Sequence, residues 1–291
     1  MDLGIIVVDL LNGLTRGFLY FLIVSGLAIT LGTMGIINFA HGSFYMLGAY
    51  LSWTTAVGMS NVTGSFWIGV IAGTTALFGL GLLVERWLLR RIYEAEHLYQ
   101  LLVTFGLVLL LDGIVLEIWG GLPKVITLPA YLTGNLSVAG RAWPVYSLFI
   151  LLFSSLIIAG LWLLLYRTRL GYECRAAAMD REMSRALGIN VTIVFMLMFA
   201  VGAAVAALAG GAGTGLMALS PGMGGAIIIL CFAIIVIGGV GSLGGAFVGA
   251  NIIGVLESFG WHYFPDSAMY LPFAIMAIVL LIRPQGLFGK V

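Results

Sequence analysis

The sequence predicts an all-α integral membrane protein, a polytopic transmembrane helical bundle with about eight to ten spans, some of them broken or re-entrant. Hydrophobic residues make up 62% of the chain and charged residues only 9%, against about 25% charged residues in an average soluble domain. Such a chain cannot cover a water-exposed surface with polar groups. Its long apolar runs do not alternate with polar residues as membrane β-strands do, so helices are expected.

Nine stretches are apolar enough to be placed as spans or half-spans of one transmembrane domain, residues 1–291. Small residues are common in membrane helices because they let two backbones approach closely, and the chain has 41 glycines. Glycines at 239 and 241 interrupt the last third, so either flanking segment is a candidate re-entrant half-helix. The expected spans are Leu10–Gly32, Met34–Val57, Gly64–Val84, Leu98–Trp119, Tyr146–Tyr166, Val191–Met217, Ala226–Val240, Leu243–Tyr263 and Met269–Ile282.

The basic residues predict the orientation of these spans. Ten of the 13 lysines and arginines fall in three places, namely residues 86–91, residues 167–185 and the C-terminal residues 283–290. Lysine and arginine collect in cytoplasmic loops, so these places, including the C-terminus, are expected in the cytoplasm. The N-terminus and the loop 120–144 are then expected on the outer side.

Residues 167–190 hold the one dense cluster of charge. Within it Met179, Met183, Ala186 and Leu187 recur at helical spacing. The pattern predicts a short amphipathic helix that docks on a soluble partner protein. The charged residues of the cluster are Arg167, Arg169, Glu173, Arg175, Asp180, Arg181, Glu182 and Arg185.

A second group of polar residues lies inside or beside an apolar span: Asn38, His41, Ser43 and Tyr45. Polar side chains at that depth face a cavity or another helix. Two interpretations stay open: hydrogen bonds that join neighbouring helices, or a broken helix that lines a substrate path. The residues at the glycine interruption are the other candidate lining of such a path, because a broken helix exposes backbone dipoles. These residues, called here the glycine break, are Gly238, Gly239, Gly241 and Ser242.

Catalytic and metal chemistry are not indicated. The three histidines, 41, 97 and 262, fall in separate regions, whereas a zinc site needs three or four convergent ligands. Cys174 and Cys231 are expected at different levels of the membrane, which indicates no disulfide. There is no phosphate-binding loop motif, and a net charge of +1 gives no reason to expect nucleic acid. We therefore expect no enzyme and no cofactor bound by this chain.

Several motifs together make the chain recognisable. In order they are GIINFAHGSFYMLGAY at 35–50, Glu85-Arg86, GYECRAAAMDREMSRALGIN at 171–190, VGAAVAALAGG at 201–211, Pro221-x-Met-Gly224 and IGGVGSLGGAFVG at 237–249. By these motifs the chain resembles the LivH-type permease subunits of high-affinity branched-chain amino acid ABC importers. That family has relatives that carry urea, short amides or aromatic carboxylates, and the resemblance covers nearly the whole chain.

The resemblance implies a transport permease of the bacterial inner membrane. Its partners would be two ATPase subunits that bind ATP and Mg, a homologous second permease subunit and a periplasmic substrate-binding protein. The stretch 175–188 would be the cytoplasmic coupling segment that sits in a groove of the ATPase. The residues implied in that contact are Arg175, Met179, Asp180, Arg181, Glu182, Met183, Arg185, Leu187 and Gly188.

Two positions depart from the family pattern. Ser43 stands where an acidic residue is frequent, and Leu230 stands where a lysine is frequent. Because an ion inside a membrane is costly unless it is paired or hydrated, losing both changes the local electrostatics. The substrate therefore stays open among branched-chain amino acids, urea, amides and aromatic carboxylates. An ion-coupled secondary transporter is the remaining alternative, and only Asp112, Glu117 and Glu257, near predicted span ends, are candidate ion partners.

Overall fold

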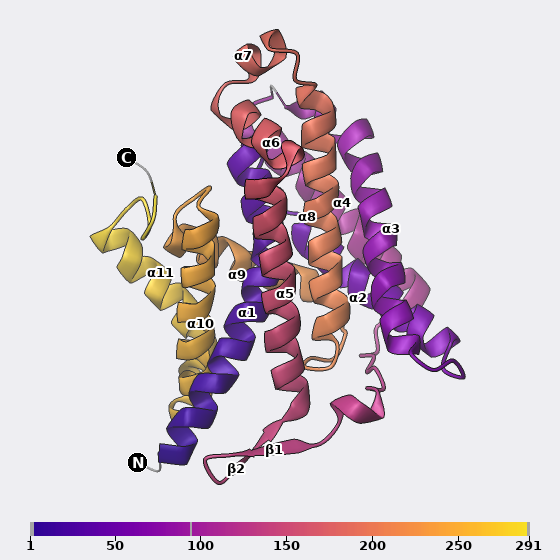
Figure 1. Ribbon diagram of the computed structural model, residues 1–291, viewed down its shortest axis with the longest axis vertical. Coiled ribbons are helices and arrows are strands. Elements are labelled where there is room, and N and C mark those ends of the chain that lie inside the picture. The colour runs from indigo at the N-terminus through magenta and orange to yellow at the C-terminus, as the bar shows by residue number, and fades with distance from the viewer. Residues whose placement is uncertain (1–2, 94, 290–291) are drawn as a thin grey trace.

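The protein is a bundle of helices whose two ends differ. The computed structural model describes residues 3–93 and 95–289. At one end lies an antiparallel hairpin of β1 (Asn135–Val138) and β2 (Arg141–Pro144), called here the hairpin end. At the opposite end lie α6 (Arg169–Met179) and α7 (Arg181–Ala186), which hold most of the arginine cluster (Figure 1). We call this the arginine end.

Seven segments of the described chain are helical, long and apolar enough to cross a membrane. This confirms the predicted polytopic helical bundle. They are Leu3–Met34 (α1), Ser65–Ile92 (α3, Ser65–Trp87, continued by η1, Leu89–Ile92), His97–Trp119 (α4), Val145–Arg167 (α5), Val191–Gly213 (α8), Leu243–Tyr263 (α10) and Pro265–Ile282 (η3, Pro265–Tyr270, and α11, Leu271–Ile282). Two further apolar elements, α2 (His41–Gly58) and α9 (Met223–Gly238), are shorter or more polar.

The second predicted span, 34–57, begins later than expected. Residues 35–40 form a non-helical turn after α1, and α2 starts only at His41. Gly35 has a φ of +67°, a conformation that glycine adopts at little cost. The Asn38 Oδ1 atom accepts a hydrogen bond from the Ala40 amide at 3.0 Å, which fixes the turn. The broken span that the sequence suggested is therefore a break before α2.

Helix α2 occupies the centre of the bundle. Every residue from His41 to Tyr50 is buried, and α2 packs on α3, α8 and α9. Its start touches the start of α9 so closely that a Cβ added at Gly42 would lie 2.1 Å from the Gly224 carbonyl oxygen. Only glycine permits this approach. Helix α1 packs mainly on α10 and α8, so α4, α5 and α11 form the periphery.

The glycine break joins α9 to α10 and is covered by the C-terminal tail. Gly239 has a φ of +100°. The amides of Leu287 and Phe288 donate hydrogen bonds to the carbonyls of Ile237 and Gly238 at 2.8 and 3.0 Å. The tail thus supplies donors to carbonyls at the end of α9, which a helix leaves unpaired.

The arginine cluster is not the single amphipathic helix that its spacing predicted. Asp180 adopts an extended backbone, φ −152° and ψ 109°, between α6 and α7. Its Oδ1 atom accepts a hydrogen bond from the Met183 amide at 2.9 Å, so Asp180 is the N-cap of α7. An aspartate side chain can take the place of a backbone carbonyl as hydrogen-bond acceptor. This capping hydrogen bond explains why the helix is interrupted at Asp180.

The outer loop expected at 120–144 is also more ordered than predicted. The hairpin pairs Asn135 with Pro144 and Val138 with Arg141. Lys124 exchanges two backbone hydrogen bonds with Leu219, each of 2.8 Å. This bridge ties the loop to the connection between α8 and α9.

Candidate coupling segment and transport cavities

Met179, Met183 and Leu187 are among the large apolar side chains that are exposed at the arginine end. Met179 is 90% exposed, Met183 57% and Leu187 74%. Met179 ends α6, Met183 lies in α7 and Leu187 directly follows α7, so they do not lie on one continuous helix. Apolar side chains that rise together from a charged segment mark an interaction surface, and we call them the exposed apolar set.

Two arginines of the same segment point back into the bundle. The Arg175 guanidinium donates to the Leu165 carbonyl at the end of α5 and lies over the rings of Tyr166 and Tyr172, at 4.9 and 4.8 Å. Arg181 donates to the carbonyl of Met34, the last residue of α1, at 2.6 Å. The segment is therefore tied to the ends of α1 and α5. Arg185 is exposed, and a rim contact between Arg181 or Arg185 and an ATPase stays a prediction.

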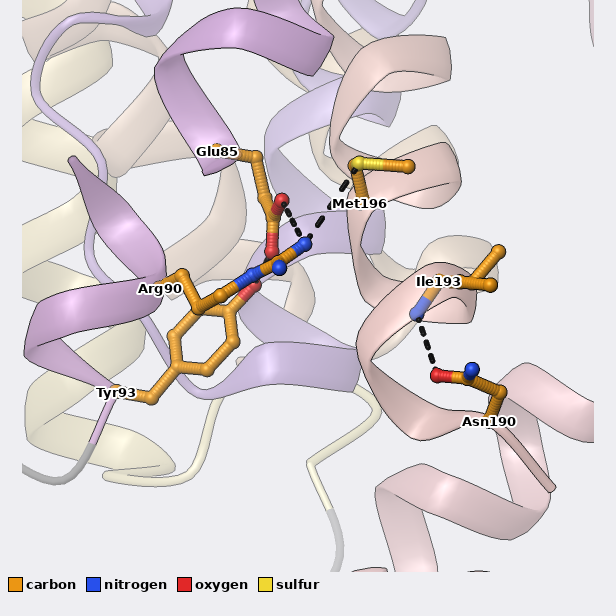
Figure 2. A network of polar contacts seen from close by, with 6 residues as sticks. All are labelled: Glu85, Arg90, Tyr93, Asn190, Ile193 and Met196. Carbon is orange, nitrogen blue, oxygen red and sulfur yellow. Dashed lines mark hydrogen bonds and ion pairs between the residues drawn. The ribbon is translucent and has the colours of Figure 1, made fainter. Parts of the chain in front are cut away.

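A buried carboxylate joins α3 to α8 nearby. Glu85 is fully buried, and its Oε2 atom lies 3.3 Å from Arg90 Nη2, while Tyr93 donates its hydroxyl hydrogen to Oε1 (Figure 2). Burial and the hydrogen bond with this carboxylate raise the pKa of Tyr93. Arg90 also reaches the Met196 sulfur on α8 at 3.8 Å. The Glu85-Arg86 motif thus supplies a link that fixes α3 and η1 against α8.

The helix α8 itself begins at a cap beside this link. Asn190 Oδ1 accepts a hydrogen bond from the Ile193 amide at 3.2 Å (Figure 2). Asparagine is a preferred N-cap because its oxygen satisfies an otherwise unpaired amide. Gly188, with a φ of +85°, ends α7 before this cap.

Two of the polar residues at the start of α2, His41 and Ser43, are held by other helices. His41 Nε2 lies 2.8 Å from the Ile23 carbonyl of α1, and Ser43 donates to Asp112 Oδ1 of α4 at 3.0 Å. Asn38 is 1% exposed. None of the three lines a described cavity of the bundle. These contacts match the interpretation in which polar groups join helices, and a role in a substrate path stays a prediction.

Asp112 is the acidic neighbour of Ser43. The sequence placed Asp112 near a predicted span end, as a candidate ion partner, and gave it no neighbour. In the structure α4 brings its carboxylate to the Ser43 hydroxyl. Ser43 and Asp112 are 69 residues apart in the sequence, so their contact cannot be deduced from local residue spacing.

Tyr45 does line a cavity, unlike its neighbours. This cavity of about 200 Å³ lies between the start of α2, the end of α8 and the start of α9. Its other lining groups include Thr214, Met217 and Met223. Gly238, Gly239, Gly241 and Ser242 do not line it. Gly241 instead borders a cavity at the arginine end that also contains Arg175 and Met179, and Ser242 caps α10 by accepting from the Gly245 amide at 3.0 Å.

A larger cavity of about 390 Å³ opens at the hairpin end, between α1, α10, the start of α5 and the α8–α9 connection. It shares Met217 with the cavity of Tyr45. Its ionisable lining groups are Asp9, Arg16, Tyr20 and His262. We call it the hairpin-end cavity.

Sequence reasoning overlooked this cavity. It treated Asp9 as part of an acidic N-terminus, and it did not use Arg16, which lies inside the first expected span. A basic residue within an apolar helix, seven positions after an acid on the same helix, was the available signal. Such intramembrane charges face the bundle interior or water.

Comparisons with known proteins agree with the helical architecture and the motifs. A family model described as "Branched-chain amino acid transport system / permease component" matches residues 9–280. The chain belongs to this family. It is a transport permease subunit.

Individual relatives span nearly the same length. The high-affinity branched-chain amino acid transport system permease protein BraD of Pseudomonas aeruginosa is 33% identical, over 97% of this chain and 95% of the relative. The permease protein LivH of Escherichia coli is 32% identical over the same shares. A probable LivH of Methanocaldococcus jannaschii is 28% identical, over 92% of this chain and 88% of the relative. No solved structure matches.

Proposed function

We propose that this permease translocates branched-chain amino acids in an ATP-driven importer, with α6 and α7 as the contact to the ATPase subunits. The observation that carries the proposal is the exposed apolar set, Met179, Met183 and Leu187, on a segment otherwise rich in charge. A buried apolar anchor surrounded by charged residues is the usual composition of a protein interface. The substrate class rests on the names of BraD and LivH.

The arginine end faces the cytoplasm in this proposal, because basic residues accumulate on that side. The coupling segment and the residues after α11 then lie in the cytoplasm, and the hairpin end faces the periplasm of a bacterial inner membrane. A periplasmic binding protein would deliver substrate to the hairpin end.

The movement of the ATPase subunits would be transmitted through α1. Arg181 binds the last carbonyl of α1, and α1 runs 32 residues to the hairpin end, about 48 Å at a rise of 1.5 Å per residue. ATP and Mg, bound by two ATPase subunits, would drive closure of those subunits. A displacement of α6 and α7 would then move α1 and, through Arg175, the end of α5.

The periphery leaves room for lipid and for a second permease subunit. Only 28% of the apolar window of α4, 22% of that of α5 and 11% of that of η3–α11 is buried within this chain. Helices that are apolar all round and little buried face lipid or another membrane subunit. We infer that a homologous permease packs on part of this surface.

The test replaces two members of the exposed apolar set by aspartate, in the variant Met183→Asp/Leu187→Asp. We expect normal membrane insertion but loss of substrate-stimulated ATP hydrolysis and of uptake, because charges at the centre of the interface are desolvated without partners. Leu122→Asp is the matched control, since Leu122 is 76% exposed at the hairpin end. Normal stimulated hydrolysis in the double variant would refute the proposed contact.

One observation favours an ion-coupled transporter instead. Asp112 is an acidic side chain within α4 that hydrogen-bonds Ser43 in the bundle, and membrane-embedded carboxylates mark proton pathways. Under the proposal, Asp112→Asn keeps ATP-dependent uptake, since asparagine retains an acceptor for the Ser43 hydroxyl. Uptake driven by a proton gradient without ATP, and lost in Asp112→Asn, would favour the alternative.

A further inference from the structure

The hairpin-end cavity contains a carboxylate with unused hydrogen-bonding capacity. The Asp9 side chain is 11% exposed, and its Oδ2 atom is buried without a hydrogen bond among the described residues. His262 Nδ1 lies 3.4 Å from this oxygen, a contact that is an ion pair only when the imidazole is protonated. A buried carboxylate oxygen without a hydrogen bond is costly, so an ammonium donor from a ligand would satisfy Asp9.

A guanidinium lies further along the same face of α1. Arg16 follows Asp9 by seven residues, two turns of helix and a rise of about 10 Å. Its one described ion pair is long, 3.5 Å to Glu257 Oε1, and its side chain is 36% exposed. A guanidinium has five N–H donors, so Arg16 retains donors for a second carboxylate.

Glu257 is held in place by three donors rather than left for a ligand. Tyr20 donates to its Oε2 atom at 2.7 Å, Trp261 donates to Oε1 at 3.3 Å, and Arg16 supplies the ion pair. These contacts join α1 to α10. They hold Arg16 beside the cavity and neutralise part of its charge.

The rest of the lining combines apolar and polar side chains. Leu19, Leu216, Met217 and Trp261 are the apolar ones, and Met217 also lines the cavity of Tyr45. The polar ones are Asn12, Thr15, Tyr20, Ser147 and Ser258. The cavity therefore offers a carboxylate, a guanidinium and apolar side chains.

We propose that the hairpin-end cavity is an entry site that selects zwitterionic, aliphatic α-amino acids, with Asp9 receiving the α-ammonium group and Arg16 the α-carboxylate. This rests on the proposed import function and assigns the selection of its substrate to two residues of α1. An α-amino acid carries its ammonium and carboxylate groups on one carbon atom, so a single ligand presents donors to Asp9 and acceptors to Arg16. Urea and amides lack both charges, and carboxylic acids lack the ammonium group.

The first test measures uptake by the complete transporter in cells, with leucine, its deaminated analogue and urea as probes. Asp9→Asn and Arg16→Gln should each raise the apparent KM for leucine tenfold or more, the effect of losing a charge-assisted hydrogen bond. Arg16→Lys should retain part of the affinity. Asp266→Asn is the control at the same end, because Asp266 is exposed and outside the cavity lining.

The second test separates binding from transport. A cysteine placed by Met217→Cys should react with a water-soluble thiol reagent, since Met217 is 42% exposed. Leucine should protect it, and the deaminated analogue and urea should not. Equal protection by all three probes, or unchanged leucine KM in both charge variants with assembly intact, would overturn the selective site. Protection by leucine without ATP-dependent uptake would instead refute the import function and leave the site standing.

Discussion

The start of α2 and the coupling segment reverse the usual distribution of polar and apolar residues. Around α2, polar side chains are buried at membrane depth: His41 is 1% exposed and Ser43 is fully buried. On α6 and α7, outside the bundle, Met179 is 90% exposed. In the first region His41 and Ser43 form hydrogen bonds with other helices, whereas in the second the apolar side chains are exposed. Polarity alone does not mark a functional surface in a membrane protein; the presence or absence of partners does.

The largest effect on stability is expected from a change that disturbs the packing of α2. Gly42→Leu should prevent folding, because even a Cβ would lie 2.1 Å from the Gly224 oxygen and overpacking commonly costs about 1–3 kcal/mol or more. The control is Gly106→Leu, where a Cβ meets nothing within 4 Å. Size-exclusion profiles and Tm in detergent are the measurements, and a Gly42→Leu variant as stable as the control would contradict the close crossing.

A milder change tests whether the buried polar residues are structural. His41→Gln should lower stability by about 1 kcal/mol or less, because glutamine can still donate to the Ile23 carbonyl. Uptake should continue, and its pH dependence should match that of the unaltered protein, since glutamine does not titrate. His41→Leu, which cannot donate, is the comparison variant. Loss of transport in His41→Gln with normal folding would assign His41 to the substrate path instead.

The smallest expected effect is a difference in thiol reactivity between a position in α6 and a position in α7. Cys174 is buried in α6, and burial raises the pKa of its thiol to about 11. At pH 8 it is therefore almost entirely the unreactive thiol, and reaction should accelerate only as the pH rises toward 11. A cysteine introduced by Met183→Cys should react rapidly at pH 8, because that position is 57% exposed. Rates of maleimide labelling make the comparison, measured in a Cys231→Ala background in which Cys174 is the one native cysteine.

Much of the architecture followed from the sequence, because long apolar runs leave a helical bundle as the favoured structure in lipid. The helix break at Asp180 did not follow, since it depends on one capping hydrogen bond that competes with an otherwise helical pattern. A broken helix near Asn38 was one of two interpretations that the sequence left open, and the position of the turn at 35–40 came from the structure. The exposure of Met179, Met183 and Leu187 agrees with the surface that their spacing suggested. The pairing of Ser43 with Asp112 and the cavity between Asp9 and Arg16 required tertiary contacts that no local pattern contains.

The polarity of α2 also affects how the chain is inserted during synthesis. Its helix is long enough to span but is not apolar enough to count as a spanning segment. Besides α3 it packs on α8 and α9, which the ribosome makes later. We therefore expect α2 to enter the membrane only after its covering helices have emerged, with α1 and α3 holding it near the insertion machinery until then. A nascent chain stopped before Val191 should leave α2 open to protease, whereas one extended beyond Gly238 should protect it.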